Sequence, residues 1–279
     1  MDSCVALVRM CPYPSGMEPI NELKQIVARL RGPGGCPWDQ EQTHESIRAQ
    51  LLEECYEALE AIDEKNDILL KEELGDVLLH IVFHAQLAEE RGVFNLEEVA
   101  RGISDKLVRR HPHVFGEDKL TTSDQVLKRW DELKKLEKPE RKGALAGIPP
   151  ILPALMQAQE VQKKAAKVGF DWKELKPVLQ KVREEMDELE QELKFLEKQP
   201  DPSILTGPVA EELGDLLFSV VNLSRHLKLD AEQCCRDATS KFVRRFEKVE
   251  KLAGEKGLRM EETDLQQLDL LWRQAKREE

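Results

Sequence analysis

The sequence is poor in aromatic residues, in paired cysteines and in long apolar runs. Aromatic residues make up 5% of the 279 residues and include two tyrosines, so little of the chain favours β-strands. None of the six cysteines stands in a CxxC pair, and a chain of this length does not need disulfides, so we expect reduced thiols and a cytoplasmic location. No apolar run approaches the length of a membrane span. Residues 1–16 lack the pattern of a signal peptide and are expected to form a disordered extension.

The chain also has fewer basic residues than acidic ones. The 42 Lys and Arg residues face 54 Asp and Glu residues, which gives a formal net charge of −12. An acidic surface repels phosphate backbones and anionic lipids, so we expect neither nucleic acid nor a membrane as a partner. A small phosphorylated ligand remains compatible with this charge if metal ions bridge the like charges. The composition, 41% hydrophobic and 34% charged, is typical of a helical soluble protein.

Helical periodicity dominates the chain from residue 19 onward. We expect five helices on each side of a Gly- and Pro-rich linker at residues 143–151, near 19–31, 43–64, 67–91, 96–110, 123–138, 152–167, 173–198, 206–228, 231–253 and 262–277. Polar pairs spaced for N-terminal capping precede three of them: Asn95 with Glu98, Asp171 with Glu174, and Asp230 with Gln233. The predicted fold is all-α, with domains of about five helices over residues 17–142 and 152–279.

An acidic motif occurs twice at nearly half the chain length. EELGDVLLHIV begins at Glu72 and EELGDLLFSVV begins at Glu211, 139 residues later. Each copy follows a second acidic motif, EECYE from Glu53 and EEMDE from Glu184. Each half therefore carries EExxE on one expected helix and ExxD on the next, which indicates a tandem duplication.

Helix geometry predicts that these carboxylates gather. At about 100° per residue, the three glutamates of EExxE span roughly a quarter of the helix circumference, and Glu73 shares a stripe with Asp76. The helix that carries this stripe is apolar nearly all round, so its carboxylates are expected to be buried and to need a partner.

Acidic helix faces are usually solvated and crossed by salt bridges, which requires Lys or Arg three or four positions away. The first half has no such residue around its acids, and the second has only Lys181, which precedes Glu184 by three residues and Glu185 by four. Uncompensated like charge in two copies favours a bound divalent cation. Carboxylate ligands alone favour Mg²⁺, or Mn²⁺, over softer metals.

A zinc site is a weaker alternative. His80 and His84 stand at i, i+4 and could hold zinc. Ser219 and Leu223 replace them in the second half, and the chain has no HExxH motif.

Cationic residues recur in the same way. KLVRR and KFVRR each place Lys and Arg at i, i+4 on one helix face, where the pair can bind two phosphoryl oxygens; the residues are Lys106 with Arg110 and Lys241 with Arg245. The last expected helix of each half pairs a tryptophan with a lysine, Trp130 with Lys134 and Trp272 with Lys276. A single pair of this kind is usually a solvated cation beside a core tryptophan. Recurrence of all four positions beside acidic motifs indicates a site for a nucleotide polyphosphate.

Together these motifs resemble those of the all-α MazG nucleoside triphosphate pyrophosphohydrolases. GGCPWDQEQTHESI (34–47) and QKKAAKVGFDW (162–172) are also similar to that family, and the resemblance extends from Met17 to Glu279. It implies Mg²⁺-dependent hydrolysis of NTPs and dNTPs to nucleoside monophosphate and pyrophosphate. It also implies helical dimers that assemble the site.

On this basis we expect the second half to be catalytic. Its expected metal ligands are Glu185, Glu188, Glu212 and Asp215, with Glu184 or Glu211 orienting or deprotonating the attacking water. Lys181, Lys241 and Arg245 would offset phosphate charge, and Trp272, beside Lys276, would stack on the base.

The first half carries a second candidate set. Its possible metal ligands are Glu54, Glu57, Glu73 and Asp76, and its possible substrate residues are Lys106, Arg110, Trp130 and Lys134. Gln50 stands where the second half has Lys181, so this half lacks a phosphate-facing cation. That difference, with the family's tendency for the C-terminal half to carry activity, favours catalysis in the second half.

Two other functions remain open. One is a different metal-dependent helical phosphohydrolase, dUTPase-like or of the HD type, although the chain has no His-Asp doublet. The other is a non-enzymatic helical adaptor that docks partners on its acidic faces. Mg²⁺-dependent nucleotide binding distinguishes an enzyme from the adaptor.

Overall fold

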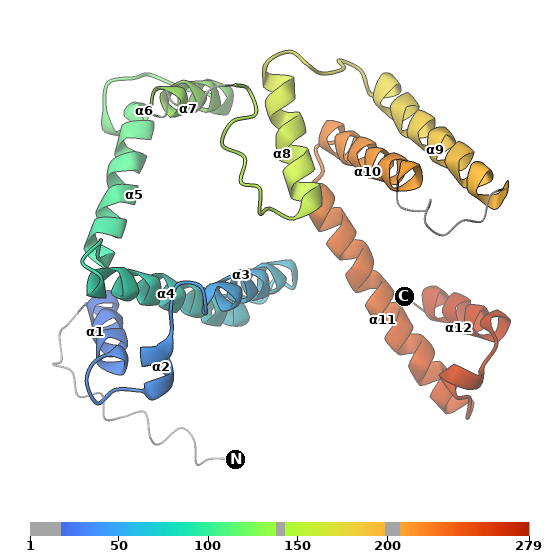
Figure 1. The fold of residues 1–279 in the computed structure, drawn as a ribbon, viewed down its shortest axis with the longest axis horizontal. Coiled ribbons are helices and arrows are strands. Elements are labelled where there is room, and N and C mark those ends of the chain that lie inside the picture. The colour runs from blue at the N-terminus through green and yellow to red at the C-terminus, as the bar shows by residue number, and fades with distance from the viewer. Residues whose placement is uncertain (1–17, 138–142, 199–206, 279) are drawn as a thin grey trace. The chain divides into compact units, whose positions relative to one another are not determined.

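The computed structural model describes residues 18–137, 143–198 and 207–278. The predicted extension over residues 1–16 lies outside these ranges. Every regular element within them is a helix (Figure 1), which confirms the all-α prediction. None of the described helices is long and apolar enough to cross a membrane. The chain divides into two compact units, Met1–Glu137 and Lys138–Glu279.

The first unit contains the five expected helices and two short ones. In chain order they are α1 (Pro19–Arg31), α2 (Pro37–Glu41), α3 (Arg48–Asp63), α4 (Asp67–Glu90), α5 (Leu96–Arg110), α6 (Pro112–Phe115) and α7 (Ser123–Glu137). The short helices α2 and α6 were not predicted because neither is long enough to show periodicity. Each starts with a proline, which is tolerated there because the first-turn N–H groups have no intrahelical partner.

Helix α3 begins at Arg48, so the prediction of a helix over 43–64 was wrong for its first five residues. The Thr43 N–H donates to Ser46 Oγ at 2.9 Å, and the Ser46 N–H donates to Thr43 Oγ1 at 3.2 Å. Side chains that bond to nearby backbone in this way compete with helix formation. The segment before α3 is therefore an ordered turn.

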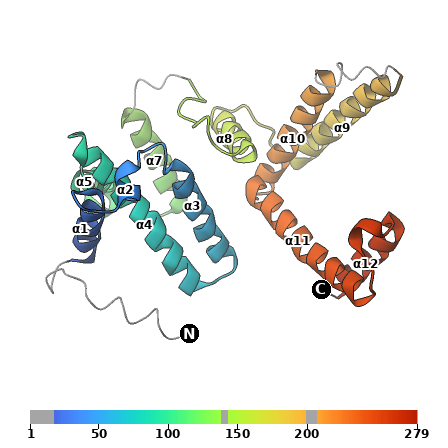
Figure 2. The same cartoon turned by 60° about the horizontal axis from the view of Figure 1, so that its bottom comes forward.

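Helix α4 organises the first unit. Helix α3 lies beside it along the two acidic motifs, and α1 packs against its other end (Figures 1 and 2). The Asn66 side chain caps α4 by accepting from the Leu69 N–H at 3.2 Å. The buried core between α1 and α4 consists of Val27, Ile47, Val82, Phe83, Ala85, Leu87 and Leu96. The capping box predicted for Asn95 and Glu98 is present at the start of α5.

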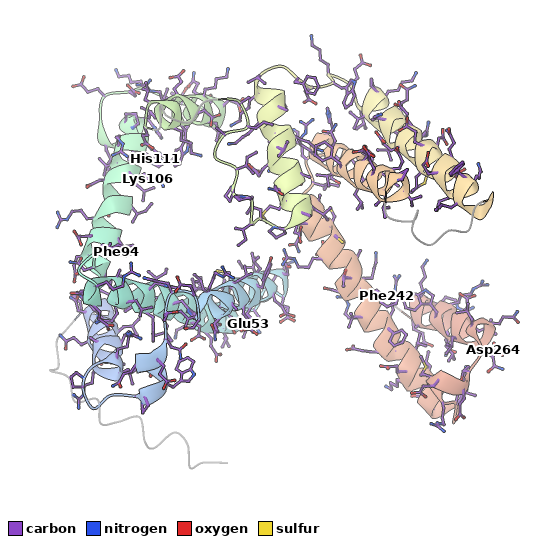
Figure 3. All side chains as sticks on the ribbon, viewed as in Figure 1. Glu53, Phe94, Lys106, His111, Phe242 and Asp264 are labelled. Carbon is purple, nitrogen blue, oxygen red and sulfur yellow. The ribbon has the colours of Figure 1, made fainter. Side chains whose placement is uncertain are left out.

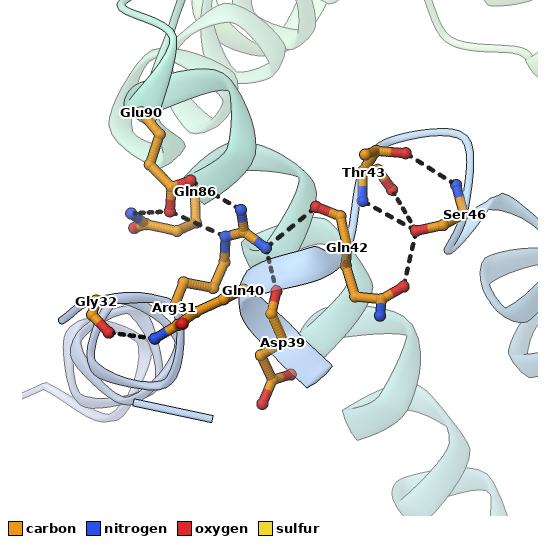
Figure 4. Close-up of polar contacts among 9 residues, drawn as sticks. All are labelled: Arg31, Gly32, Asp39, Gln40, Gln42, Thr43, Ser46, Gln86 and Glu90. Atoms are coloured by element: carbon orange, nitrogen blue, oxygen red, sulfur yellow. Dashed lines mark hydrogen bonds and ion pairs between the residues drawn. The ribbon is translucent and has the colours of Figure 1, made fainter. Parts of the chain in front are cut away.

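Arg31 ties the loop after α1 to the end of α4. Its Nε and Nη2 donate to the two carboxylate oxygens of Glu90 at 2.9 and 2.8 Å, and its Nη1 donates to the carbonyls of Asp39 and Gln42 (Figure 4). The Arg31 side chain is 6% exposed and that of Glu90 is 37% exposed, and the bidentate geometry makes the pair stronger than a single charged hydrogen bond. It positions the chain that leads into α3.

The second unit has the five predicted helices, with ends within three residues of the predicted ones. They are α8 (Ala154–Lys167), α9 (Leu175–Lys198), α10 (Pro208–His226), α11 (Ala231–Glu255) and α12 (Leu265–Arg277), with a 3₁₀ turn, η3, over Met260–Glu262. Asp230 caps α11 as predicted, accepting from the Gln233 N–H at 2.9 Å.

Helices α9 and α10 form the pair that carries the second set of acidic motifs, and α8 packs across α10 (Figures 1 and 2). The Gln162 side chain of α8 donates to the Phe218 carbonyl of α10 at 2.8 Å. Helix α12 folds back on the C-terminal half of α11, and the two enclose Val249, Ala253, Leu271 and Ala275.

Asp171 does not cap α9, contrary to the prediction. Helix α9 begins at Leu175, and the Asp171 carboxylate instead accepts from Arg225 Nη1 at 3.0 Å. His226 Nε2 also lies 3.0 Å from this carboxylate. The ion pair joins the loop after α8 to the end of α10 through charge-assisted hydrogen bonds, which are of the strong kind.

The helix pairs leave apolar side chains uncovered. On α10, Leu213, Leu217, Phe218 and Val220 are 46, 51, 44 and 41% exposed. On the α3–α4 pair, Leu52, Ile62 and Leu74 are 57, 53 and 54% exposed. Each helix pair therefore has apolar side chains on its exposed surface, as interaction surfaces often do.

Candidate functional site

In the second unit three carboxylates converge between α9 and α10. Oxygens of Glu185, Glu212 and Asp215 all lie within 4.8 Å of one another. Glu212 and Asp215 stand one turn apart on α10, and Glu185 reaches them from α9. Glu188 follows one turn along α9, and burial, followed by a hydrogen bond shared with Glu185, raises its pKa. All four predicted metal ligands of this half are thus brought together.

The first unit has the equivalent arrangement between α3 and α4. Oxygens of Glu54, Glu57 and Glu73 lie within 4.8 Å of one another. Burial raises the pKa of Glu54, and the charge of Asp76, the fourth predicted ligand, is close enough to raise it further. Counted from the two motifs, these four residues correspond one by one to the four of the second unit.

Burial and like charge raise the pKa of carboxyls in both groups. For Glu212 the largest cause is burial, followed by repulsion from Asp215 and Glu185. For Glu73 it is again burial, followed by repulsion from Glu57. Glu73 is 8% exposed and Glu185 is 5% exposed. Buried carboxylates that repel one another are poorly satisfied, and a divalent cation between them would remove the conflict.

The donor set fits a hard cation. Each group offers carboxylate oxygens from two facing helices, with no thiolate among them in the described part of the chain. Oxygen-only sets of this kind suit Mg²⁺ or Mn²⁺. A divalent ion is therefore compatible with both units, and the chemistry of the ligands favours the hard members of that class.

The two groups differ in the cation beside them. In the second unit Lys181 Nζ lies 2.6 Å from Glu184 and 2.8 Å from Glu185. In the first unit Gln50 occupies that position, and its amide, oriented to satisfy its hydrogen bonds, donates to the Ser46 and Ile47 carbonyls. Lys181 therefore contacts a predicted metal ligand directly. Its i, i+4 spacing from Glu185 allowed this contact.

Sequence reasoning missed two neighbours of these groups. Glu192, one turn beyond Glu188 on α9, repels Glu212 and contributes to its raised pKa; the continued spacing 185, 188, 192 was the available signal. In the first unit His80 Nε2 lies 4.0 Å from Glu54 Oε1. Its i, i+4 relation to Asp76 on an apolar helix was the signal there.

The predicted cation and tryptophan pairs also meet in each unit. The Arg245 guanidinium carbon lies 5.9 Å from the centre of the Trp272 ring. In the first unit the Arg110 guanidinium carbon lies 5.5 Å, and Lys134 Nζ 5.9 Å, from the centre of Trp130. Lys241 and Lys276 are exposed on α11 and α12. Lys106 is half-buried on α5.

Two of these residues have other roles as well. Arg110 forms an ion pair with Glu137, which also accepts from Arg109 Nε at 2.9 Å. Trp272 packs against the apolar core between α11 and α12 and is flanked by Phe242, with ring centres 5.1 Å apart.

The carboxylate and cation clusters are separate within a unit. Figure 3 labels Glu53 on α3 and Lys106 on α5, and the two lie well apart in the first unit. In the second unit only the first part of α11 approaches α8 and α10, and the helix then leads away from the α9–α10 pair (Figure 1). Within a unit, the cation pairs of α5 and α11 therefore lie apart from its carboxylates.

Comparisons with a family profile and with individual known proteins point to the same family. The family profile of the MazG nucleotide pyrophosphohydrolase domain matches the chain twice, over residues 42–115 and 173–250. The chain is 50% identical over 256 residues to the nucleoside triphosphate pyrophosphohydrolase/pyrophosphatase MazG of Thermotoga maritima, covering 91% of this chain and 94% of that protein. It is 45% identical over 266 residues to the nucleoside triphosphate pyrophosphohydrolase of Escherichia coli K12, covering 94% of this chain and 99% of that protein.

Proposed function

This chain belongs to the MazG nucleotide pyrophosphohydrolase family, and on that premise we propose that it hydrolyses nucleoside and deoxynucleoside triphosphates to monophosphates and pyrophosphate. The role is the removal of unwanted nucleotides from the cellular pool. We place the protein in the cytoplasm, where its substrates are made. The described cysteines are free, which suits a reducing compartment.

One observation carries the proposal: two helix pairs each gather carboxylates into a compact, partly buried group. A triphosphate carries several negative charges and cannot approach such a group unless cations lie between them. Helical surfaces with solvated acids do not need Glu73 and Glu185 to be more than 90% buried. The geometry therefore fits a polyphosphate substrate that binds together with divalent metal.

We assign the metal to Glu185, Glu188, Glu212 and Asp215. Bound Mg²⁺ would neutralise the polyphosphate and lower the pKa of a coordinated water. Glu184 and Glu211 flank these ligands, are exposed, and are the candidates to orient the attacking water and accept its proton. The water oxygen bonds to the α-phosphorus while the bond from that phosphorus to the α–β bridging oxygen breaks, and pyrophosphate leaves.

Other residues of the second unit would bind the substrate. Lys181, when a metal ion takes over the charge of Glu185, becomes available to a phosphoryl oxygen. Lys241 and Arg245 offer further cations one turn apart on α11. Trp272 offers an aromatic face for the base, with Lys276 one turn away on α12.

We propose that the second unit is the active one. Lys181 and Glu192 have no charged counterparts in the first unit, where Gln50 and Ala61 stand at those positions. The first unit, with Glu54, Glu57, Glu73 and Asp76, and with Arg110 already paired to Glu137, is a weaker or structural copy. The two domains, residues 17–142 and 152–279, are separated by the turns of 143–151.

We further propose a homodimer. The uncovered apolar faces of α3, α4 and α10 need a second helical layer. A second chain would also bring its α5 and α11 cations to carboxylates that they do not reach within their own unit.

The test is hydrolysis of a triphosphate panel in H₂¹⁸O with Mg²⁺. Attack at the α-phosphorus places ¹⁸O in the monophosphate and none in pyrophosphate, as mass spectrometry of both products would show. Label in pyrophosphate or in orthophosphate would contradict the proposed reaction, and no turnover of any triphosphate would contradict the enzyme.

A further inference from the structure

Three of the six histidines gather in the first unit, where residues 42–47 cross α4. The Nδ1 atoms of His44 and His84 lie 2.8 Å apart. Their rings are parallel to within 4°, with centroids 5.1 Å apart. At this distance one imidazole donates its single N–H to the lone pair of the other. Two imidazole nitrogens therefore face one another directly.

Two other ring nitrogens of this cluster are buried and lack a hydrogen-bond partner: His84 Nε2 and His80 Nδ1. Buried polar atoms without partners are uncommon and unfavourable. His80 stands one turn before His84 on α4, and its Nε2 faces Glu54 at 4.0 Å. The cluster thus has more nitrogen ligands than its own hydrogen bonds use.

The spacing of the pair is near that of two ligands on one metal ion. With Zn–N bonds of about 2.0–2.1 Å and tetrahedral angles, two ligand nitrogens lie about 3.3 Å apart. The observed separation is shorter by about 0.5 Å, so the two rings must turn apart to admit an ion between them. Burial, followed by the neighbouring His44 and His80, lowers the pKa of His84.

Packing alone does not account for the imidazoles. In the second unit the corresponding positions hold Leu175, Ser219 and Leu223. Ser219 is buried and donates to the Leu216 carbonyl of its own helix at 2.9 Å. The same helix pair therefore forms without any of the three histidines.

We propose that His44 and His84 bind a borderline divalent ion of the Zn²⁺ or Cu²⁺ class through one ring nitrogen each. Imidazole selects these ions, whereas the carboxylate centres select Mg²⁺. The ion holds residues 42–47 on α4 and so fixes the start of α3, the helix that bears Glu54 and Glu57. The site belongs to the first unit and does not depend on which unit is catalytic.

The test is Cu²⁺ electron paramagnetic resonance of the full-length protein in excess Mg²⁺, which occupies oxygen ligands. We expect one Cu²⁺ per chain with couplings from at least two imidazole nitrogens, also when the protein is first loaded with Zn²⁺, because Cu²⁺ binds such ligands more tightly. His84→Leu and His44→Leu, which copy the second unit, should lose these couplings. His113→Ala, which removes a histidine outside the cluster, should keep them.

A wild-type spectrum with oxygen ligands only overturns the proposal without reference to any variant. So does a nitrogen-coupled spectrum that His84→Leu leaves unchanged. As a second measurement, Zn²⁺ in excess Mg²⁺ should raise the Tm of the wild type and not of His84→Leu. An equal rise in both would show that the pair is only a hydrogen bond.

Discussion

Lys181 Nζ lies 2.8 Å from a carboxylate oxygen of Glu185, a residue that also groups with Glu212 and Asp215. Hydrogen bonds to Glu184 and then to Glu185 raise the pKa of Lys181, so the ammonium stays charged at neutral pH. Without metal, the Lys181 ammonium lies against Glu185 and partly neutralises the cluster of carboxylates. A metal ion that binds Glu185 must compete with it, and the released ammonium can then meet a phosphate.

The competition predicts opposite effects of one substitution on metal and substrate. Lys181→Gln copies Gln50 of the first unit. Without the competing ammonium, the Kd for Mg²⁺ should fall. The KM for a triphosphate should rise roughly tenfold or more, because a hydrogen bond to a charged group is worth about 1.5–3 kcal/mol. Calorimetry of Mg²⁺ binding and steady-state kinetics measure the two effects. Weaker Mg²⁺ binding in Lys181→Gln would contradict this relationship, and Gln50→Lys serves as the control in the other unit.

Glu212 should destabilise the metal-free protein at neutral pH. Burial and the charges of Asp215 and Glu185 raise its pKa. Because the pKa is raised in the folded state, the protonated carboxyl contributes stability at pH values below its ordinary pKa near 4.5. That contribution is lost as the pH rises through the folded-state pKa. Glu212→Gln should therefore raise the Tm in EDTA at pH 7 and have little effect near pH 4.

With Mg²⁺ present, the Tm of Glu212→Gln should instead fall below that of the wild type, because the variant lacks a metal ligand. The Mg²⁺-induced rise in Tm at pH 7 should be smaller in Glu212→Gln than in the wild type. Thermal unfolding in EDTA and in Mg²⁺ at the two pH values checks all four cases. An equal Mg²⁺ effect in both proteins would remove Glu212 from the metal site.

Glu137 should stabilise the first unit over a different pH range. Hydrogen bonds from Arg110 and Arg109 lower its pKa to about 2. A lowered carboxyl pKa contributes stability that is complete above the ordinary value near 4.5 and is lost as pH falls toward 2. Glu137→Gln should thus lower the Tm at pH 6, with a difference from the wild type that shrinks between pH 4.5 and 2. Glu132→Gln, at a 63% exposed side chain on the same helix, should show almost no effect at either pH.

Gly35 should tolerate no side chain, in contrast to its neighbour. A Cβ on Gly35 would lie 2.1 Å from the Leu30 carbonyl oxygen and 2.4 Å from that of Arg29. Gly35→Ala must displace the loop that Arg31 holds, at a cost of about 3 kcal/mol, the upper end of overpacking effects. Gly34 has a φ of +72° and open space around its Cβ position, so Gly34→Ala should cost about 1–2 kcal/mol. Urea unfolding of the full chain compares them, and equal losses would contradict the close approach.

The periodic features of this chain were predictable, and the local exceptions were not. Helix α4 and helix α10 follow from long apolar patterns, and the capping box of Asn95 with Glu98 was readable from spacing. The turn of Thr43 with Ser46 depends on side chains that bond to backbone only in one local conformation. Asp171 had a capping spacing, but the sequence could not show that Arg225, 54 residues away, would compete for it.

The candidate site was predictable in its ligands but less so in their surroundings. Two EExxE and ExxD motifs on adjacent helices place Glu185 and Glu212 together because the helix pair has one register that buries its apolar stripe. Neighbours outside the motifs, such as Glu192 and His80, depend on the rotation of each helix. The contact of Lys181 with Glu185 was visible as an i, i+4 spacing, yet its competition with metal emerges only from the buried geometry.

The most direct test of the account compares one substitution at matched positions of the two units. Glu57 and Glu188 are the last glutamates of the two EExxE motifs. Pyrophosphate release from a triphosphate panel with Mg²⁺ should fall at least about 100-fold in Glu188→Ala, since a metal ligand is lost. In Glu57→Ala release should stay near the wild-type rate. If each variant instead retains about half of the activity, both units are catalytic, and the assignment of the reaction to the second unit is contradicted.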